Sequence, residues 1–164
     1  MANFQTIWNN HPTIKGDVPL LDQKVYANQC AINVSAALVR SGVPLTGFRG
    51  ALSWQKEKPK YAIRAQELAN WLKTTFPRIP TSFKSVSAKD FSSQLYGQRG
   101  IIFFQNYWGL GNQGDHIDLW DGSKLTDWRS WARINIRVGS YGLHNLGAGS
   151  DFKKAEAVWF WGIS

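Results

Sequence analysis

The sequence is poor in cysteine, with Cys30 as its single example in 164 residues. One cysteine excludes an intramolecular disulfide and a zinc site built from several thiolates. Long apolar runs are also missing, because no stretch approaches the roughly 20 residues that a membrane-spanning helix needs. The first residues show no basic segment followed by an apolar one. We therefore expect neither membrane insertion nor a Sec-type signal peptide, so that any export must use another route.

The positive charge of the chain is not clustered. Lys and Arg number 19 against 11 Asp and Glu, which gives a net charge of +8. This balance suggests an acidic partner, such as nucleic acid, an anionic envelope polymer or an acidic protein. Basic residues are scattered without a run of five, which argues against a nucleic-acid-binding tail. The nine Trp are unusually many, and we expect most of them in the core, with a groove for a sugar or peptide as the alternative.

The order of the predicted elements indicates the fold class. A hydrophobic content of 43% with 18% charged residues indicates one globular domain over residues 1–164. Helical spacing predicts a short helix before residue 11 and helices over about 29–41, 63–76 and 88–96. Strand patterns cover 100–108, 116–120, 123–127 and 156–163, with an alternating piece at 134–138. Because the helices precede the strands, the class is α+β, with N-terminal helices on a mostly antiparallel sheet.

Cys30 falls in the first turn of the helix predicted over 29–41. Asn28 is a suitable N-cap, and Gly42 is suited to end the helix. The apolar positions that give this helix a buried side are Ala31, Val34, Ala37 and Leu38. The first turn joins free backbone N–H groups with the positive end of the helix dipole, a setting that favours a thiolate over a thiol.

A predicted β-hairpin supplies a histidine and an acid. If Asp121-Gly122 form a two-residue turn, counting outward places His116 opposite Asp127. Directly opposed residues have Cβ atoms about 4.5–5.5 Å apart on one face of the hairpin. Asp127 then holds one imidazole nitrogen and leaves the other for a nucleophile. Asp118, on the same face two residues along from His116, is the second choice for the orienting acid.

Cys30, His116 and an orienting acid are the parts of a cysteine hydrolase that needs no metal or other cofactor. The backbone N–H of Cys30 is the expected oxyanion donor, with Gln29 as the candidate second donor. The alternatives are a buried, inert Cys30 beside an ordinary surface His–Asp pair, and a non-catalytic basic, aromatic-rich module that binds nucleic acid or glycan. His11, before a proline, and His144, in a Gly-rich segment, are expected at the surface.

These motifs resemble those of the type VI secretion amidase effectors of the fourth amidase group, relatives of the NlpC-type cell-wall cysteine peptidases. The resemblance rests on Asn28-Gln29-Cys30-Ala31-Ile32 and on His116-x-x-Leu119-Trp120-x-Gly122 followed by Asp127. Tyr61-x-x-Arg64 and Gly100-Ile101-Ile102 add to it. It covers most of the chain, with the least support in residues 133–152.

The resemblance implies a papain-like, NlpC-like fold with Cys30, His116 and Asp127 as a catalytic triad. It also implies a toxin made in the cytoplasm without a signal peptide and injected into the periplasm of a competitor. There the toxin is expected to cleave the amide between γ-D-glutamate and meso-diaminopimelate in peptidoglycan stem peptides. A cognate immunity protein is expected to block the groove. The remaining alternative is a cytosolic cysteine hydrolase acting on another γ-glutamyl amide.

Overall fold

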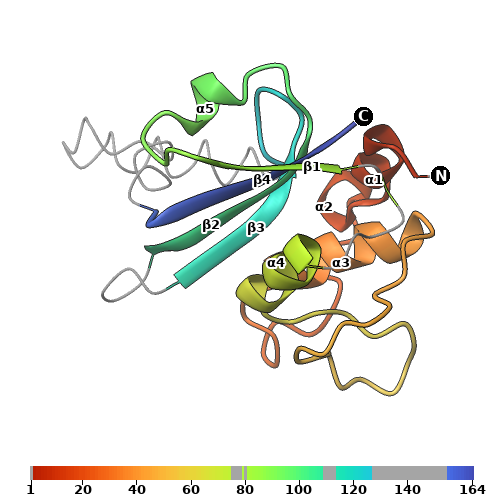
Figure 1. Ribbon diagram of the computed structural model, residues 1–164. Helices are drawn as coiled ribbons and strands as arrows, with labels where there is room; N and C mark the ends of the chain where they lie inside the picture. The colour runs from red at the N-terminus through yellow and green to blue at the C-terminus, as the bar shows by residue number, and fades with distance from the viewer. Residues whose placement is uncertain (1, 75–78, 80, 109–113, 127–154) are drawn as a thin grey trace, which may run out of the picture.

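A computed structural model describes residues 2–74, 79, 81–108, 114–126 and 155–164 of the chain. Its helices and strands confirm the predicted α+β class (Figure 1). The helices are α1 Phe4–Asn10, α2 Pro12–Lys15, α3 Cys30–Arg40, α4 Ala65–Thr74 and α5 Phe91–Gln94. The strands are β1 Thr81–Val86, β2 Gly100–Trp108, β3 Gly114–Trp120 and β4 Ala157–Ile163. The segment 134–138, predicted to alternate, lies outside the described residues.

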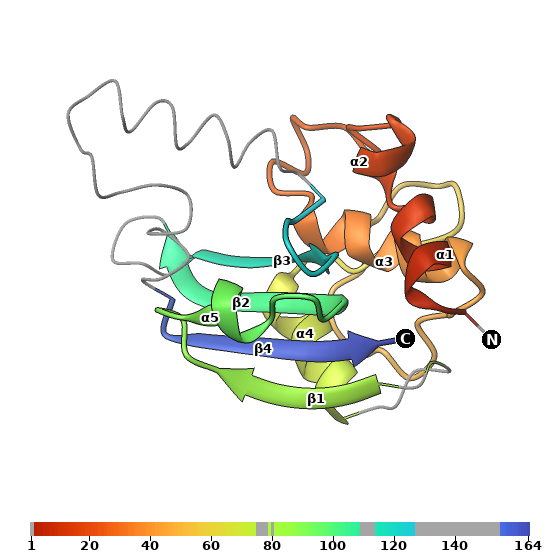
Figure 2. The same cartoon turned by 90° about the horizontal axis from the view of Figure 1, so that it is seen from above.

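The four described strands form one antiparallel sheet in the order β1-β4-β2-β3. The last strand in the chain, β4, lies between β1 and β2 and is hydrogen-bonded to both, as Figure 2 shows. β2 is apolar on both sides because Ile101, Ile102, Phe103 and Phe104 are all fully buried. A strand covered on both faces has a continuous apolar run, and the sequence of β2 has one over residues 101–104.

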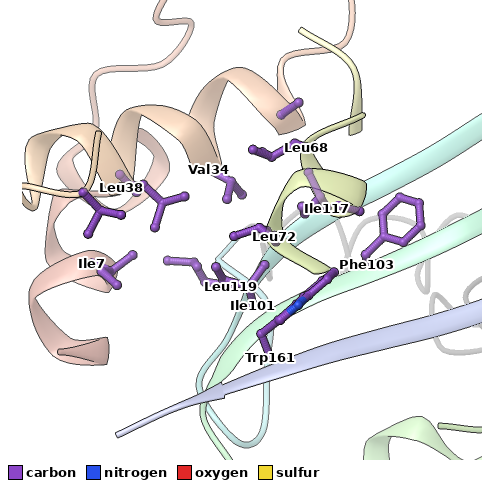
Figure 3. Packing of buried hydrophobic residues seen from close by; sticks show 14 of the residues in the cluster. Ile7, Val34, Leu38, Leu68, Leu72, Ile101, Phe103, Ile117, Leu119 and Trp161 are labelled. Carbon is purple, nitrogen blue, oxygen red and sulfur yellow. The ribbon is translucent and has the colours of Figure 1, made fainter. Parts of the chain in front are cut away.

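The two faces of β2 belong to different apolar clusters. Ile101 and Phe103 pack with α3 and α4, whereas Ile102 and Phe104 pack with Phe91 of α5. Helices α1–α4 therefore lie on one side of the sheet and α5 on the other (Figure 1). Figure 3 shows the larger cluster, in which the labelled side chains include Ile7, Val34, Leu38, Leu68, Leu72, Ile117, Leu119 and Trp161.

Helix α3 follows the sequence pattern closely. Its predicted apolar side is buried, and the helix ends before Gly42, which has the left-handed φ of 81° typical of a helix terminus. The cap differs from the prediction, because the helix begins at Cys30 and Gln29 is its N-cap residue. Asn28 still accepts a free helix donor, since its Oδ1 lies 3.2 Å from the backbone nitrogen of Cys30.

Strand β1 was not predicted from the sequence. Its residues are mostly polar, and none of them is fully buried. It occupies one end of the strand order, where it pairs only with β4 among the described strands. A strand exposed in this way needs no continuous run of apolar residues, which is the signal that predicted β2.

The turn after β3 is longer than predicted. A two-residue turn pairs Trp120 with Ser123, but in the structure Trp120 pairs with Leu125. The side chain of Asp121 explains the difference, because its Oδ1 accepts the backbone N–H groups of Ser123 at 2.9 Å and Lys124 at 2.8 Å. These local bonds stabilise a four-residue connection. The hairpin register that selected Asp127 is therefore wrong.

The pairing of Gly100 in β2 with Gly162 in β4 generates a test of the fold. A Cβ added to Gly100 is placed 2.0 Å from the carbonyl oxygen of Trp161, which belongs to the backbone of a central strand. A Cβ added to Gly162 meets the flexible side chain of Ser82 at 2.7 Å. We expect Gly100→Ala to lower the free energy of unfolding in urea by about 1–3 kcal/mol.

The matched control is Gly162→Ala, which introduces the same methyl group into the paired position. It is expected to cost less, because the Ser82 hydroxyl can rotate away. Equal losses for the two variants contradict the close approach of β2 to β4 at Gly100.

Candidate active site

Helix α3 and strand β3, which are in contact, bring the predicted nucleophile and base together (Figure 1). Cys30 and His116 line one cavity of about 390 Å³. Asp118, Thr126 and His11 line the same cavity. Residues almost ninety positions apart in the sequence thus meet where the first turn of α3 faces β3.

His116 and Asp118 lie on one face of β3, as expected for residues two positions apart in a strand. The Nε2 atom of His116 lies 3.6 Å from Oδ2 of Asp118. The Asp118 side chain is buried, whereas the His116 side chain keeps 22% of its surface exposed to the cavity side. The His116 ring also stacks on Phe104, with 6.3 Å between the ring centroids, which limits its rotation.

The other oxygen of Asp118 is held by the protein. Oδ1 accepts the backbone N–H of Leu119 at 2.7 Å and the hydroxyl of Thr126. Nε2 of His11 lies 3.7 Å from the same oxygen. Oδ2 is therefore the oxygen directed at His116, and the carboxylate is oriented by groups from three separate parts of the chain.

The electrostatics favour an imidazolium at His116. Burial lowers the pKa of His116, but its interactions with Asp118 and Cys30 outweigh burial and raise that pKa to about 10. Burial raises the pKa of Asp118, and the hydrogen bond from His116 and the neighbouring positive charges outweigh it, so that the net shift is downward. The site stabilises a positively charged imidazole between a carboxylate and a sulfur atom.

The acid beside His116 in the structure is Asp118, the second choice from the sequence. Asp127, the first choice, lies outside the described residues. The turn register that favoured Asp127 is wrong, so the hairpin argument for it no longer holds. Its role in a triad stays a prediction that rests on the family resemblance.

The two expected oxyanion donors differ in the structure. The backbone N–H of Cys30 is at the start of α3, where it donates to Asn28 at 3.2 Å. The side chain of Gln29 is committed elsewhere, because its Nε2 donates to the carbonyl oxygens of Leu21 at 2.6 Å and Tyr26 at 3.2 Å. Both hydrogens of that amide are used in this arrangement, so the role of Gln29 as a second oxyanion donor stays a prediction.

His11 was expected at the surface and is instead 2% exposed. It lies between α1 and α2, and its ring reaches the Asp118 carboxylate. One sequence signal could have placed His11 at the start of a helix. His11 is followed by Pro12, and proline is common in the first helical position after a cap residue. Thr126 gave no signal, because its contact with Asp118 depends on the longer turn. His144 lies outside the described residues.

A second cavity, of about 440 Å³, also reaches Cys30 and Asn28. Arg64, Glu67 and Asp115 provide its charged groups. Nη1 of Arg64 lies 3.1 Å from Oε1 of Glu67, while 70% of the Arg64 side chain remains exposed. Cys30 thus lies where two cavities meet.

Neither a metal-binding group nor a membrane-spanning helix is found in the described part of the chain. No group of three or more His, Cys, Asp or Glu there is arranged to hold a metal ion. Among the described helices, none combines the length and apolar character needed to cross a membrane.

The raised pKa of His116 predicts how stability depends on pH. Because folding raises this pKa from 6.5 to about 10, protonated His116 stabilises the fold fully below pH 6.5, and this contribution is lost as the pH rises through about 10. Asp118→Asn removes the main favourable partner, so the imidazole should titrate at lower pH and the alkaline loss of stability should begin earlier.

NMR titration of the imidazole and urea unfolding at a series of pH values measure both effects. Asp90→Asn is the matched control, because Asp90 is an exposed acid at the start of α5, on the other side of the sheet, and its side chain makes no capping hydrogen bond. An unchanged His116 titration in Asp118→Asn contradicts the pairing of these two side chains.

The chain is similar to known proteins in sequence and in fold. The family model described as type VI secretion system (T6SS), amidase effector protein 4, matches residues 26–161. A chain of the effector–immunity complex Tae4–Tai4 from Enterobacter cloacae is similar at 25% identity, with a TM-score of 0.59, over 77% of this chain and 84% of that chain.

A chain of the effector–immunity system Tae4/Tai4 from Salmonella typhimurium is similar in fold over 99% of this chain and 98% of that chain, with a TM-score of 0.66 and 18% identity. No curated protein sequence matches the chain. Because the family model covers residues 26–161, from before Cys30 into β4, the chain belongs to the Tae4 family of type VI secretion system amidase effectors.

Proposed function

We propose that residues 1–164 form one amidase domain in which Cys30 is the nucleophile, His116 the acid–base group and Asp118 the orienting acid. The observation that carries this proposal is the meeting of Cys30 and His116 in one cavity, with the Asp118 carboxylate 3.6 Å behind the imidazole. Because Nε2 of His116 faces Asp118, Nδ1 is the nitrogen left for the thiol. The geometry thereby matches the order nucleophile, base and orienting acid.

The reaction follows from the charges of the site. The Cys30 thiolate attacks the carbonyl carbon of the scissile amide and forms a C–S bond. The imidazolium of His116 gives its proton to the amine as the C–N bond breaks. Neutral His116 then takes a proton from water, the resulting hydroxide attacks the thioester, and the C–S bond breaks to restore thiolate and imidazolium. One water is consumed, and an amine and a carboxylate are released.

The backbone N–H of Cys30 stabilises the oxyanion in this proposal. In the free protein this donor is directed to Oδ1 of Asn28, which lines both cavities. The developing oxyanion carries more charge than an amide oxygen, so it competes favourably for the same hydrogen. Asn28 therefore occupies the donor until substrate arrives.

The two cavities accommodate the two sides of the scissile amide. Both reach Cys30, so a substrate chain that crosses the thiol extends into each of them. Oδ1 of Asn33 is buried on the first cavity and has no hydrogen-bond partner among the described residues, which makes it an acceptor for a substrate N–H. The exposed guanidinium of Arg64 on the second cavity suits a substrate carboxylate.

The substrate we propose is the peptidoglycan stem peptide, cleaved between γ-D-glutamate and meso-diaminopimelate in the periplasm of rival bacteria. Family membership supports an amidase effector of a type VI system. The carboxylates of stem peptides suit a protein with a net charge of +8. Similar solved structures contain Tae4 in complex with the immunity protein Tai4, and we infer that a cognate immunity protein binds this chain and covers its cavities.

The first test removes the nucleophile. Cys30→Ala should reduce the release of stem-peptide fragments from purified diaminopimelate-type sacculi by on the order of 10⁵- to 10⁶-fold, because no other group can form the thioester. Mass spectrometry of the fragments before and after treatment also identifies the bond that is cut. Undiminished cleavage by the folded variant excludes this mechanism.

The same variant tests the alternative of a basic, aromatic-rich binding module. Among the tryptophans whose side chains the structure describes, Trp71, Trp120 and Trp161 are buried in the core and Trp54 alone is mostly exposed. Two results together would favour the binding module. The wild-type protein would show no hydrolytic activity, and both it and Cys30→Ala would be retained on sacculi or DNA in a salt-sensitive manner.

A second test decides between the two acids. Asp118→Asn keeps the shape of the side chain but removes the charge behind His116, so kcat should fall by up to about 10⁴-fold. Asp127→Asn, the matched variant at the other candidate, should cost less. The opposite order in the sacculus assay assigns the orienting role to Asp127, as the family resemblance implies.

A further inference from the structure

His11 is fixed at the junction of α1 and α2 by its own backbone. Its N–H donates to the carbonyl oxygen of Trp8 at 3.1 Å, and its carbonyl oxygen accepts the N–H of Lys15 at 2.9 Å. The side chain caps α2, because Nδ1 accepts the backbone N–H of Thr13 at 3.2 Å. A ring nitrogen that accepts carries no hydrogen, so the ring proton of His11 lies on Nε2.

The nitrogen that carries this proton is the one that approaches the acid of the active site, at an ion-pair distance longer than a hydrogen bond. Nε2 of His11 lies 3.7 Å from Oδ1 of Asp118, and both side chains are almost completely buried. The two oxygens of Asp118 therefore have different surroundings. Oδ1 faces His11, the Leu119 N–H and the Thr126 hydroxyl, whereas Oδ2 faces His116.

We propose that His11 is a positioning residue that holds Oδ1 of Asp118, so that Oδ2 stays directed at His116. This inference rests on the proposed function, in which Asp118 orients the base. The terminal torsion of an aspartate is broad, so its carboxylate rotates unless both oxygens are held. The N-terminal helices are thus part of the active site, although they contribute no group that touches the reacting atoms.

The titratable and polar groups that face this pair come from several elements. Asp118 is faced by His116 on its own strand, by Thr126 after the turn and by His11 from the N-terminal helices. His116 is faced by Asp118 and by Cys30 of α3. Loss of the His11 donor leaves a buried carboxylate less well satisfied and weakens its hold on the imidazolium.

Two substitutions separate the two nitrogens of His11. His11→Asn places an amide oxygen near the former Nδ1, so it keeps the cap on Thr13 and loses the donor to Asp118. His11→Gln places an amide N–H near the former Nε2, so it keeps the donor and loses the cap. If His11 only caps α2, His11→Gln should lose more activity than His11→Asn, because it loses the cap. If His11 positions Asp118, His11→Asn should lose more activity, because it loses the donor.

The first readout is the pH dependence of Cys30 alkylation by iodoacetamide, which needs no substrate and tests His11 even if sacculi prove to be the wrong substrate. In His11→Asn the alkylation at neutral pH should slow on the order of ten- to hundredfold, and the His116 titration seen by NMR should move to lower pH. His11→Gln should keep the wild-type alkylation profile while unfolding at a lower temperature.

The second readout is cleavage of sacculi, where His11→Asn should lower kcat and leave KM unchanged. A folded His11→Asn protein with the wild-type alkylation profile and His116 titration overturns the inference. Equal losses in the Asn and Gln variants also overturn it, since they indicate a packing role. If His11→Asn does not fold, a slowed alkylation in His11→Gln overturns the inference and a wild-type profile supports it.

Discussion

The carboxylate of Asp118 carries its charge in the interior, and the surrounding structure is arranged to satisfy it. Removing one partner from a buried ion pair typically costs about 3–5 kcal/mol, so a carboxylate at 3% exposure needs several donors at once. They come from β3 itself, from the residues after the turn and from the junction of α1 and α2. The position of His116 depends on this carboxylate, and the chemistry of Cys30 depends on His116.

Local patterns made much of the fold predictable. The helix after Cys30, the apolar strand β2 and the closing strand β4 all have runs whose spacing matches their burial. β1 could not be predicted because it is mostly polar, with no fully buried residue, and its place beside β4 depends on a partner more than seventy residues later. The sequence therefore identifies elements that bury a face, and it misses elements that tertiary pairing creates.

The site was predictable in part, because local sequence patterns identify the helix and the strand that carry its residues. Cys30 and His116 follow from their places at the beginning of a helix and within a strand, and the structure brings them together. The choice of acid depended on the turn, where the Asp121 side chain stabilises a longer connection than its Asp-Gly sequence suggests. His11 depended on packing between remote helices, which no local pattern reports. One side chain in a turn was thus enough to change the hairpin register from which the acid was predicted.

The place of β4 in the sheet has a consequence for synthesis of the protein. β1 and the β2–β3 pair are joined only through β4 among the described strands, and the carbonyl oxygen of Ser164 accepts the N–H of Phe4 at 3.0 Å. A nascent chain that has emerged as far as β3 still presents unpaired edges on β1 and β2. Because these pairings are long-range, the sheet closes only after β4 has been synthesised and has left the ribosome.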